Sequence, residues 1–301
     1  MTDPALHRRG LLLMLGATLC WATAGVLVRT LALRDAWEVT FWRSFFMAVF
    51  LFGVLVVQYR SQVWRRIAAV GWPGLISGAL LAIMFVCFIV ALSRTTVANT
   101  LVLTSLSPFM SAIAGGLLLG EHVPRRTWIA MAVAFGGIAL MFADSLSTGG
   151  TSGNLIALAI PVAFALNVTI LRKMRASTDM VPTVLIAGVL SCLMTISFAV
   201  PFRIVAADLP NLLALGVVQL GIGCLLMVVA SRHLRAAEVG LFAELETIFG
   251  IVSTWIFIGE VPGRLALIGG ITVILALAAN EAVRIFAGDS NPDPLQEVPQ
   301  P

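Results

Sequence analysis

The sequence contains few charged residues, and this shortage excludes most classes of soluble protein. Asp, Glu, Lys and Arg make up only 11% of the 301 residues, whereas a soluble domain carries about 25%. An ordinary cytosolic enzyme and a disordered chain both need more polar sequence to remain in water. The only lysine is Lys173, and no GxxxxGK[ST] phosphate loop occurs, which excludes a P-loop ATPase.

Cysteines and catalytic motifs are also scarce. The four cysteines are too few for a secreted disulfide scaffold, and they lie in apolar stretches at no metal-ligand spacing. They are Cys20, Cys87, Cys192 and Cys224. Neither an HExxH nor a GxSxG motif occurs, so the usual zinc-hydrolase and serine-hydrolase signals are missing. We therefore expect no metal, no cofactor and no enzymatic activity.

Apolar residues dominate instead. They make up 59% of the chain, and the mean hydropathy is +1.01. About 20 mostly apolar residues span a bilayer, and the apolar runs between charged, proline and glycine residues predict ten spans. The predicted spans are residues 10–28, 37–57, 67–92, 97–119, 127–143, 154–171, 181–201, 211–231, 237–258 and 265–283. The expected fold is an all-α polytopic membrane protein with ten transmembrane helices, located in the cell inner membrane.

The positive charges predict which side of the membrane each loop occupies. With the N-terminus in the cytoplasm, thirteen of the 19 Lys and Arg residues fall in cytoplasmic segments, five in external loops and Arg43 inside the second span. This bias follows the positive-inside rule and places both termini in the cytoplasm. It also explains the net charge of +4, so no nucleic-acid partner is expected. Cytoplasmic tails are expected at residues 1–9 and 287–301, and the second, rich in Pro, Asp and Gln, is expected to be disordered.

The second half of the sequence repeats features of the first half. The sequence can be aligned with itself at a fixed offset. At one offset, which we call the first shift, Gly120-Glu121 at the end of the fourth predicted span aligns with Gly259-Glu260 at the end of the ninth. A second, slightly longer shift pairs Arg29, which follows the first span, with Arg172, which follows the sixth. Repeated features at a fixed spacing predict that one structural unit occurs twice.

The two repeats are predicted to be residues 10–143 and 153–286, with five helices in each. An odd number of helices inverts the second repeat in the membrane relative to the first. Inverted repeats are typical of transporters, in which the two halves form a site near the midplane that opens to either side. We therefore expect a secondary transporter that works by alternating access.

Short motifs, in matching order along both halves, give the sequence a resemblance to a known family. The motifs are Cys20-Trp21-Ala22-Thr23, Phe41-Trp42-Arg43-Ser44-Phe45, Ala91-Leu92-Ser93-Arg94-Thr95-Thr96-Val97-Ala98-Asn99, Leu106-Ser107-Pro108, Gly120-Glu121, Arg235-Ala236-Ala237-Glu238-Val239, Leu245-Glu246-Thr247 and Gly259-Glu260. In order and spacing the chain resembles the EamA-type members of the drug/metabolite transporter (DMT) superfamily over residues 10–285. One departure is Thr247, where such proteins often carry proline, so a softer kink is expected there than at Pro108.

The resemblance implies a ten-helix transporter whose helices one, three, four, six, eight and nine line the pathway. It also implies export of small organic metabolites, with bacterial amino-acid exporters, including aromatic amino-acid exporters, as the most similar proteins. The expected substrate is therefore an amino acid or a similar metabolite, with aromatic or apolar ones favoured. Membrane lipid surrounds the chain, and proton coupling and facilitated diffusion both remain open.

Carboxylates in the ninth predicted span are the strongest candidates for functional residues. A charge at the bilayer centre costs about 2.5–3.5 kcal/mol, so such residues usually serve function. Glu238 lies within about 80° of Glu246 on the same helix, and their counterparts in the fourth span are Asn99 and Ser107. We expect these four residues to face one another in a polar stripe that lines a central pathway and binds substrate. The alternative is that they form interhelical hydrogen bonds that only hold the bundle together.

Two aromatic residues occupy matching positions in the first and sixth spans. The second shift sets Trp21 against Phe164, and Asn167 follows three residues later on the same helix face. Aromatic rings beside an amide fit an amphipathic organic solute, so we assign all three residues to the substrate site. The alternative is that the two rings only pack in the core.

Three further residues are candidates for gating or structural roles. Arg43 lies a few residues inside the second span, where it either contacts an anionic group or snorkels to the outer interface, and its position favours snorkelling. Pro108 and Pro161 are expected to interrupt and kink the fourth and sixth spans. Such kinks fit both bending gates and tight static packing.

A second class of function is an intramembrane enzyme or a lipid-handling protein that uses Glu246 as an acid or base. The missing nucleophile and metal motifs disfavour an enzyme. A lipid-handling protein needs a lateral opening and a basic headgroup site, and neither is visible in the sequence.

Overall fold

A computed structural model describes residues 4–174, 180–234 and 236–286. The tail expected at residues 287–301 lies outside these ranges, as do residues 1–3. The tail expected at residues 1–9 is instead helical from residue 4, where the first helix begins. This difference follows from the apolar residues that begin at Leu11, because a helix that spans the membrane extends easily by one or two turns into the polar residues before it.

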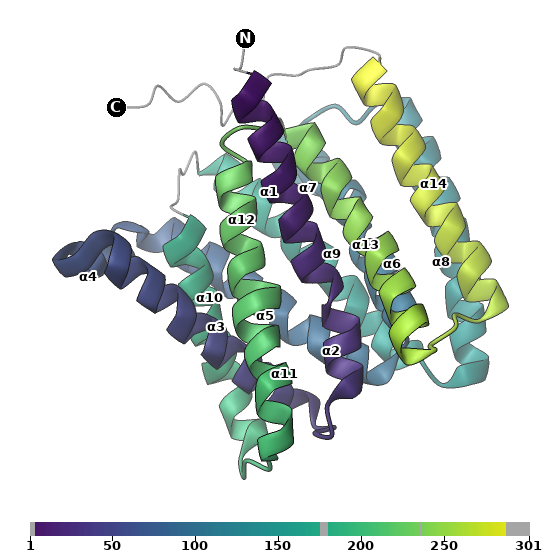
Figure 1. The fold of residues 1–301 in the computed structure, drawn as a ribbon. Helices are drawn as coiled ribbons and strands as arrows, with labels where there is room; N and C mark the ends of the chain where they lie inside the picture. The colour runs from purple at the N-terminus through teal and green to yellow at the C-terminus, as the bar shows by residue number, and fades with distance from the viewer. Residues whose placement is uncertain (1–3, 175–179, 235, 287–301) are drawn as a thin grey trace.

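Within the described ranges every regular element is helical (Figure 1). The elements are α1 (Pro4–Ala22), α2 (Ala24–Thr30), α3 (Ala36–Tyr59), η1 (Arg60–Gln62), α4 (Val63–Ala69), α5 (Gly71–Arg94), α6 (Val97–Thr104), α7 (Ser107–Leu119), α8 (Arg125–Thr148), α9 (Thr151–Lys173), α10 (Met180–Ala199), η2 (Ala206–Asp208), α11 (Leu209–Leu213), η3 (Ala214–Ile222), α12 (Gly223–Ala230), α13 (Ala236–Ile258) and α14 (Arg264–Phe286). This confirms the expected all-helical class.

The helices also match the predicted spans in length and composition. In the described part of the chain, eight helical stretches are long and apolar enough to cross a membrane, and α14 adds a shorter apolar stretch, Arg264–Asn280. Helix α13 covers the ninth predicted span. The chain is therefore a polytopic helical membrane protein, while the count of ten spans remains a prediction.

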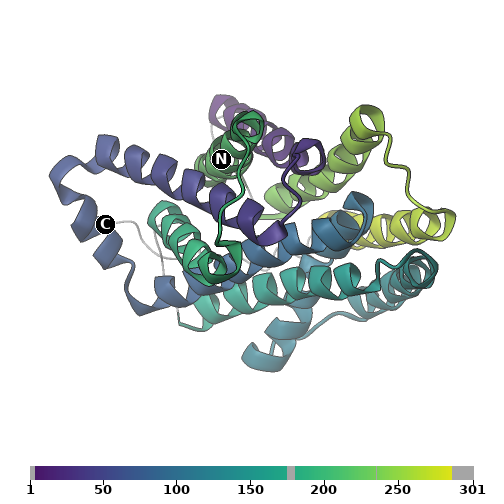
Figure 2. The same cartoon turned by 90° about the horizontal axis from the view of Figure 1, so that it is seen from below.

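Successive long helices alternate in direction, so the loops gather at two ends of the bundle. We call the end where α1 begins and α14 finishes the proximal end, and the other, where α2 finishes, the distal end (Figure 1). The closest helix pairs are α8 with α14, α3 with α10, and α5 with α9. Figure 2, seen from the distal end, shows α3 and α4 projecting from one side of the bundle.

Two helices in the first half are broken near their middle. Between α1 and α2, the Thr23 hydroxyl donates to the Cys20 carbonyl (2.6 Å), and the Ser253 hydroxyl of α13 donates to the Ala22 carbonyl (3.3 Å). Side chains thus satisfy carbonyls that the break exposes, as a membrane interior requires.

The second break separates α6 from α7 at Ser105 and Leu106. Pro108 is the second residue of α7 and has no N–H to offer the Thr104 carbonyl four residues earlier. The Ser107 hydroxyl donates to that carbonyl instead (2.7 Å). The interruption expected at Pro108 is therefore confirmed, and Ser107 stabilises it.

The counterparts of these broken helices in the second half are continuous. Helix α9 contains Pro161 but runs unbroken from Thr151 to Lys173. The helix shows no break at Pro161, so the expected interruption is not found, while the expected kink stays a prediction. Helix α13 passes through Thr247 without a break, consistent with a residue there that still has an N–H.

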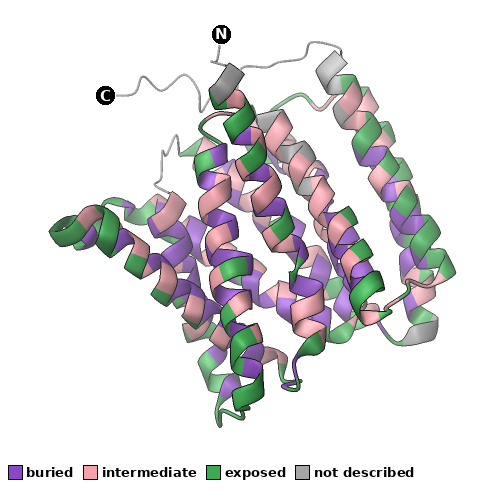
Figure 3. Cartoon of the chain, in the orientation of Figure 1, coloured by how far each residue is buried: buried purple, intermediate pink, exposed green. Residues whose placement is uncertain are grey.

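The distribution of buried residues fits a lipid environment (Figure 3). Small and apolar side chains pack between the helices, whereas large apolar side chains such as Val57, Leu117 and Phe257 are mostly exposed on the outer surface. Exposed apolar area of this extent is disfavoured in water and is expected where acyl chains cover the protein.

Candidate functional site

Arg43 is the buried cation of the candidate site. It lies seven residues after the start of α3, about 10 Å along the helix, and only 2% of its surface is exposed. Its guanidinium carbon lies 5.8 Å from the centre of the Phe85 ring and 5.5 Å from that of Phe88, both on α5. The side chain therefore points into the bundle. The favoured expectation of snorkelling is wrong because aromatic rings and polar groups inside the bundle replace the missing water.

Gln219 supplies the closest polar partner of Arg43. The Arg43 Nε donates to the Gln219 Oε1 at 3.2 Å. Gln219 lies on η3, a nine-residue π-helix, and π-helical turns are rare and frequent at functional sites. The π-helix lies very close to α3, since a Cβ at Gly216 would be 2.6 Å from the Arg43 carbonyl oxygen. Glycine at this position permits the approach that brings Gln219 to Arg43.

Glu246 of α13 adds a negative charge to the same region. Glu246 and the Cys224 thiol of α12 lie within electrostatic range of the Arg43 guanidinium, although none of the ion pairs and hydrogen bonds of the described residues joins these three side chains directly. Trp21 of α1 packs against Gly223, next to Cys224, where any side chain would collide with the indole ring. We call the resulting group the central cluster. It comprises Trp21, Arg43, Phe85, Phe88, Gln219, Cys224 and Glu246.

The central cluster combines a fixed cation, a carboxylate and an amide within apolar walls. A guanidinium binds carboxylates in a planar, bidentate geometry. A carboxylate binds ammonium groups, and the aromatic rings suit apolar side chains. Interactions between charges are strong here because little water screens them. The arrangement can therefore bind a small molecule that carries both signs of charge.

The structure does not form the expected four-residue polar stripe. Asn99 lies at the distal end, where its amide donates to Ser145 (3.0 Å) and Asn154 (3.3 Å). Glu238 lies at the proximal end, where it faces His7 at 3.4 Å. Since α6 and α13 run in opposite directions, counterpart positions on them fall at opposite ends. This part of the expectation is wrong, and Ser107 donates to its own helix as described above.

Phe164 and Asn167 lie on α9, which packs against α5 and α7. Phe164 is half-buried and Asn167 is buried. Among the hydrogen bonds of the described residues, none reaches the Asn167 amide oxygen. Trp21 packs on α12 instead, so the two expected aromatic counterparts occupy separate parts of the bundle.

Sequence reasoning missed four members of the central cluster, which are Phe85, Phe88, Gln219 and Cys224. Gln219 did leave a signal, because it is a lone amide in an apolar span that also contains Gly216, Gly221 and Gly223. A polar residue flanked by glycines indicates a place where another helix approaches closely.

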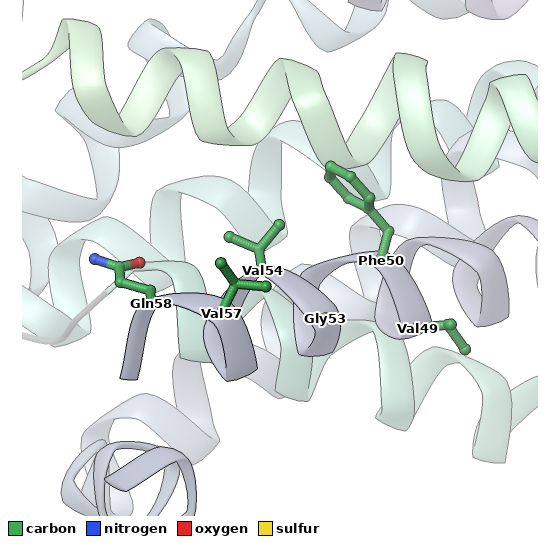
Figure 4. A pocket seen from close by; sticks show the side chains of 6 residues that line it. All are labelled: Val49, Phe50, Gly53, Val54, Val57 and Gln58. Carbon is green, nitrogen blue, oxygen red and sulfur yellow. The ribbon is translucent and has the colours of Figure 1, made fainter. Parts of the chain in front are cut away.

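A separate apolar pocket lies along the proximal half of α3 (Figure 4). Its volume is about 550 Å³, and its lining residues are Val49, Phe50, Gly53, Val54, Val57 and Gln58. No charged side chain is among these lining residues. The pocket therefore lacks the groups that would orient a polar solute, unlike the central cluster.

A membrane-spanning helical bundle with a charged cluster buried between its two halves has the architecture of a secondary transporter. Comparison with known families makes this specific. The chain belongs to the EamA-like transporter family, whose model matches residues 8–143 and again 151–280.

Two curated relatives match almost the whole chain. Both are described as pseudopaline exporter CntI, from strains UCBPP-PA14 and PAO1 of Pseudomonas aeruginosa. Each is 27% identical over 282 residues, covering 91% of this chain and 96% of the relative. A crystal structure with 17% identity aligns with a TM-score of 0.63 over 93% of this chain and 99% of that one. This last likeness supports the fold alone.

Proposed function

We propose that this chain exports amino acids or similar zwitterionic metabolites across the cytoplasmic membrane by alternating access, with the central cluster as the binding site. The observation that carries the proposal is the presence of both signs of charge in the central cluster: Arg43 of α3 is buried and Glu246 of α13 is half-buried, and the two helices belong to different halves. The similarity to the pseudopaline exporters favours export as the direction. The positive-inside bias favours a cytoplasmic proximal end.

The charge pair matches an α-amino acid in both signs. The Arg43 guanidinium would hold the substrate carboxylate, and Glu246 would hold the ammonium group. Trp21, Phe85 and Phe88 would contact the side chain, which favours aromatic and apolar substrates. Phe164 and Asn167 enter the proposal as residues of α9 that line the pathway at a second position. To Asn99, Ser107 and Glu238 we assign roles in packing, because each has a protein partner.

Glu246 also gives the proposal a route to proton coupling. A carboxylate that alternately holds a proton and a substrate ammonium group would link export to the proton gradient. The E246Q variant keeps the shape of the side chain but cannot carry a proton. It should therefore lose any dependence of transport on an imposed pH gradient.

The test is uptake of matched labelled compounds into proteoliposomes, with and without a proton gradient. Phenylalanine carries both charges, phenethylamine lacks the carboxylate, and 3-phenylpropionate lacks the ammonium group. We expect saturable transport of phenylalanine and at least tenfold weaker transport of the other two, because each leaves one buried charge without a partner. Equal transport of all three compounds would contradict a zwitterion site, and transport of none would contradict the substrate class.

A further inference from the structure

Two Arg–Glu ion pairs link the halves of the molecule, one at each end of the bundle. At the distal end Arg29 of α2 pairs with Glu260, which follows α13. At the proximal end Arg172 of α9 pairs with Glu121, which follows α7. In both cases an arginine from the first helix of one half meets a glutamate that follows the fourth helix of the other half.

The sequence relates the two pairs residue by residue. The second of the two shifts aligns Arg29 with Arg172, and the first aligns Glu121 with Glu260. The preceding glycines have the same left-handed backbone, with φ of 71° at Gly120 and 75° at Gly259. Glycine adopts this conformation without strain, so each helix ends in the same turn and directs its glutamate toward the other half.

The distal pair is closed. The Arg29 Nε and a Glu260 oxygen are 2.7 Å apart, with 24% and 19% of the side chains exposed. The other Glu260 oxygen accepts the Val97 N–H at the start of α6 (2.6 Å), and Arg29 also donates to the Thr95 carbonyl (2.8 Å). Glu260 therefore joins α2, the start of α6 and the α13–α14 loop.

The proximal pair is looser. The Arg172 and Glu121 atoms are 3.4 Å apart, with 27% and 44% of the side chains exposed. The Glu121 carboxylate faces Arg172 and also lies over Gly115 of its own half, where a Cβ would be 2.6 Å from a Glu121 oxygen. The shift that aligns Glu121 with Glu260 also aligns Val97 with Ala236, at the start of α13. The proximal end therefore contains the residues equivalent to Arg29, Glu260 and Val97, but its Arg–Glu pair is longer and more exposed.

We propose that Arg29–Glu260 and Arg172–Glu121 are alternating latches, which hold the distal and proximal ends shut in opposite states of the transport cycle. This inference rests on the proposed alternating access. In the present state the distal latch is closed. In the opposite state Glu260 no longer accepts the Val97 N–H at the start of α6. Glu121 instead accepts the N–H at the start of α13, in the equivalent hydrogen bond at the proximal end. The four latch residues are positioning residues, because they act by controlling access to the central cluster.

Cys224 provides a built-in reporter, because it lies in the central cluster. The chain carrying C20A, C87A and C192A retains Cys224 as its only thiol. A membrane-impermeant methanethiosulfonate is applied to right-side-out and to inverted membrane vesicles, and the labelling rate is measured from each side. A control variant lacks the four native cysteines and carries R94C at an exposed distal position. Its labelling shows on which face of the membrane the distal end lies.

The variants make opposite predictions. E260Q should raise labelling of Cys224 from the distal side by about tenfold, because the amide places an NH2 group where one of the two accepting oxygens was and removes the negative charge that pairs with Arg29. E121Q should lower distal labelling, because it weakens the state in which the proximal end is shut. E260D keeps the charge and both accepting oxygens on a shorter side chain, so it should return the rate toward that of the parent. R94Q removes a distal arginine outside the latch and should leave the rate unchanged.

The outcomes separate the latch from the proposed function. If Cys224 is labelled from both sides at rates that E260Q and E121Q leave unchanged, the latch is overturned while alternating access stands. If Cys224 is reached from one side only in every variant, both ideas fall. Labelling of the detergent-unfolded protein confirms equal amounts of thiol, and recovery in E260D shows that the E260Q effect does not come from misfolding.

Discussion

The distal and proximal ends are built from equivalent residues and yet are closed to different degrees. At the distal end, three carboxylates accept backbone hydrogen bonds of 2.6–2.8 Å from the loops. Glu260 accepts from Val97, Glu38 accepts from Arg203, and Asp208 accepts from two N–H groups of the α2–α3 loop. At the proximal end, the ion pairs of Glu121 and Glu238 both measure 3.4 Å. The equivalent Arg–Glu pairs therefore form at both ends, and the distal one is the tighter, with Glu38 and Asp208 adding contacts that have no proximal equivalent among the described residues.

The two halves differ in a second way that bears on movement. The first half has two helices broken in the middle, between α1 and α2 and between α6 and α7, whereas α9 and α13 in the second half are continuous. A break lets the two parts of a helix tilt separately. The distal latch joins α2 and α6, which are the distal parts of the two broken helices. Its release would free these parts while the longer helices stay in place.

The largest effect is expected at the central cluster, which belongs to neither end. R43Q removes the buried cation that we propose holds the substrate carboxylate, and loss of one partner from a buried charge contact costs about 2–5 kcal/mol. We expect transport of phenylalanine to fall at least 30-fold in either direction across the membrane. Proteoliposome assays in both orientations measure this.

R43K serves as the graded control, because it keeps the charge but loses the planar fork. It should retain part of the activity, and R94Q should retain all of it. A defect in one direction only would assign Arg43 to an end rather than to the site between the ends.

A smaller effect is expected on the thermal stability of variants in the two latches. E260Q loses a hydrogen bond to a charged group in a half-buried setting, worth about 1.5–3 kcal/mol, which corresponds to a fall in Tm of about 3–12 °C. E121Q breaks a more exposed pair worth about 0–1 kcal/mol. Thermal unfolding of the purified proteins in one detergent measures both. Equal shifts would contradict the difference between the ends.

The smallest difference between the ends is expected for the two helix-ending glycines, where the ends should agree. G120A and G259A each place a side chain at positive φ, with no atom within 4 Å of the new Cβ at either site. The cost comes from the backbone alone and is about 1 kcal/mol in each case. The two variants should lower Tm by the same amount, about 2–4 °C. Unequal values would show that the turns are not equivalent.

The sequence predicted the helical class and the transporter family, and it aligned the residues of one latch with those of the other. It succeeded there because apolar runs, glycine turns and repeated dipeptides are local patterns. It placed Trp21 and Glu246 among the site residues, and the structure brings both to the central cluster.

The remainder depended on how helices pack against one another. Arg43 was interpreted from its distance to the membrane surface, and sequence does not reveal that Phe85, Phe88 and Gln219 surround it. The polar stripe failed for a topological reason, since inversion sends Asn99 and Glu238 to opposite ends. The π-helix that carries Gln219 forms where η3 meets α3, and this contact is set by tertiary packing.

The central claim is that the two ends close alternately around one buried site, and distances measured at both ends test it most directly. Spin labels at Thr30 and Val261 report on the distal end, and labels at Lys173 and His122, their equivalents under the same shifts, report on the proximal end; all four positions are exposed. The account predicts that E260Q lengthens the distal distance and shortens the proximal one. Distances that change together, or that do not change at either end, would contradict it.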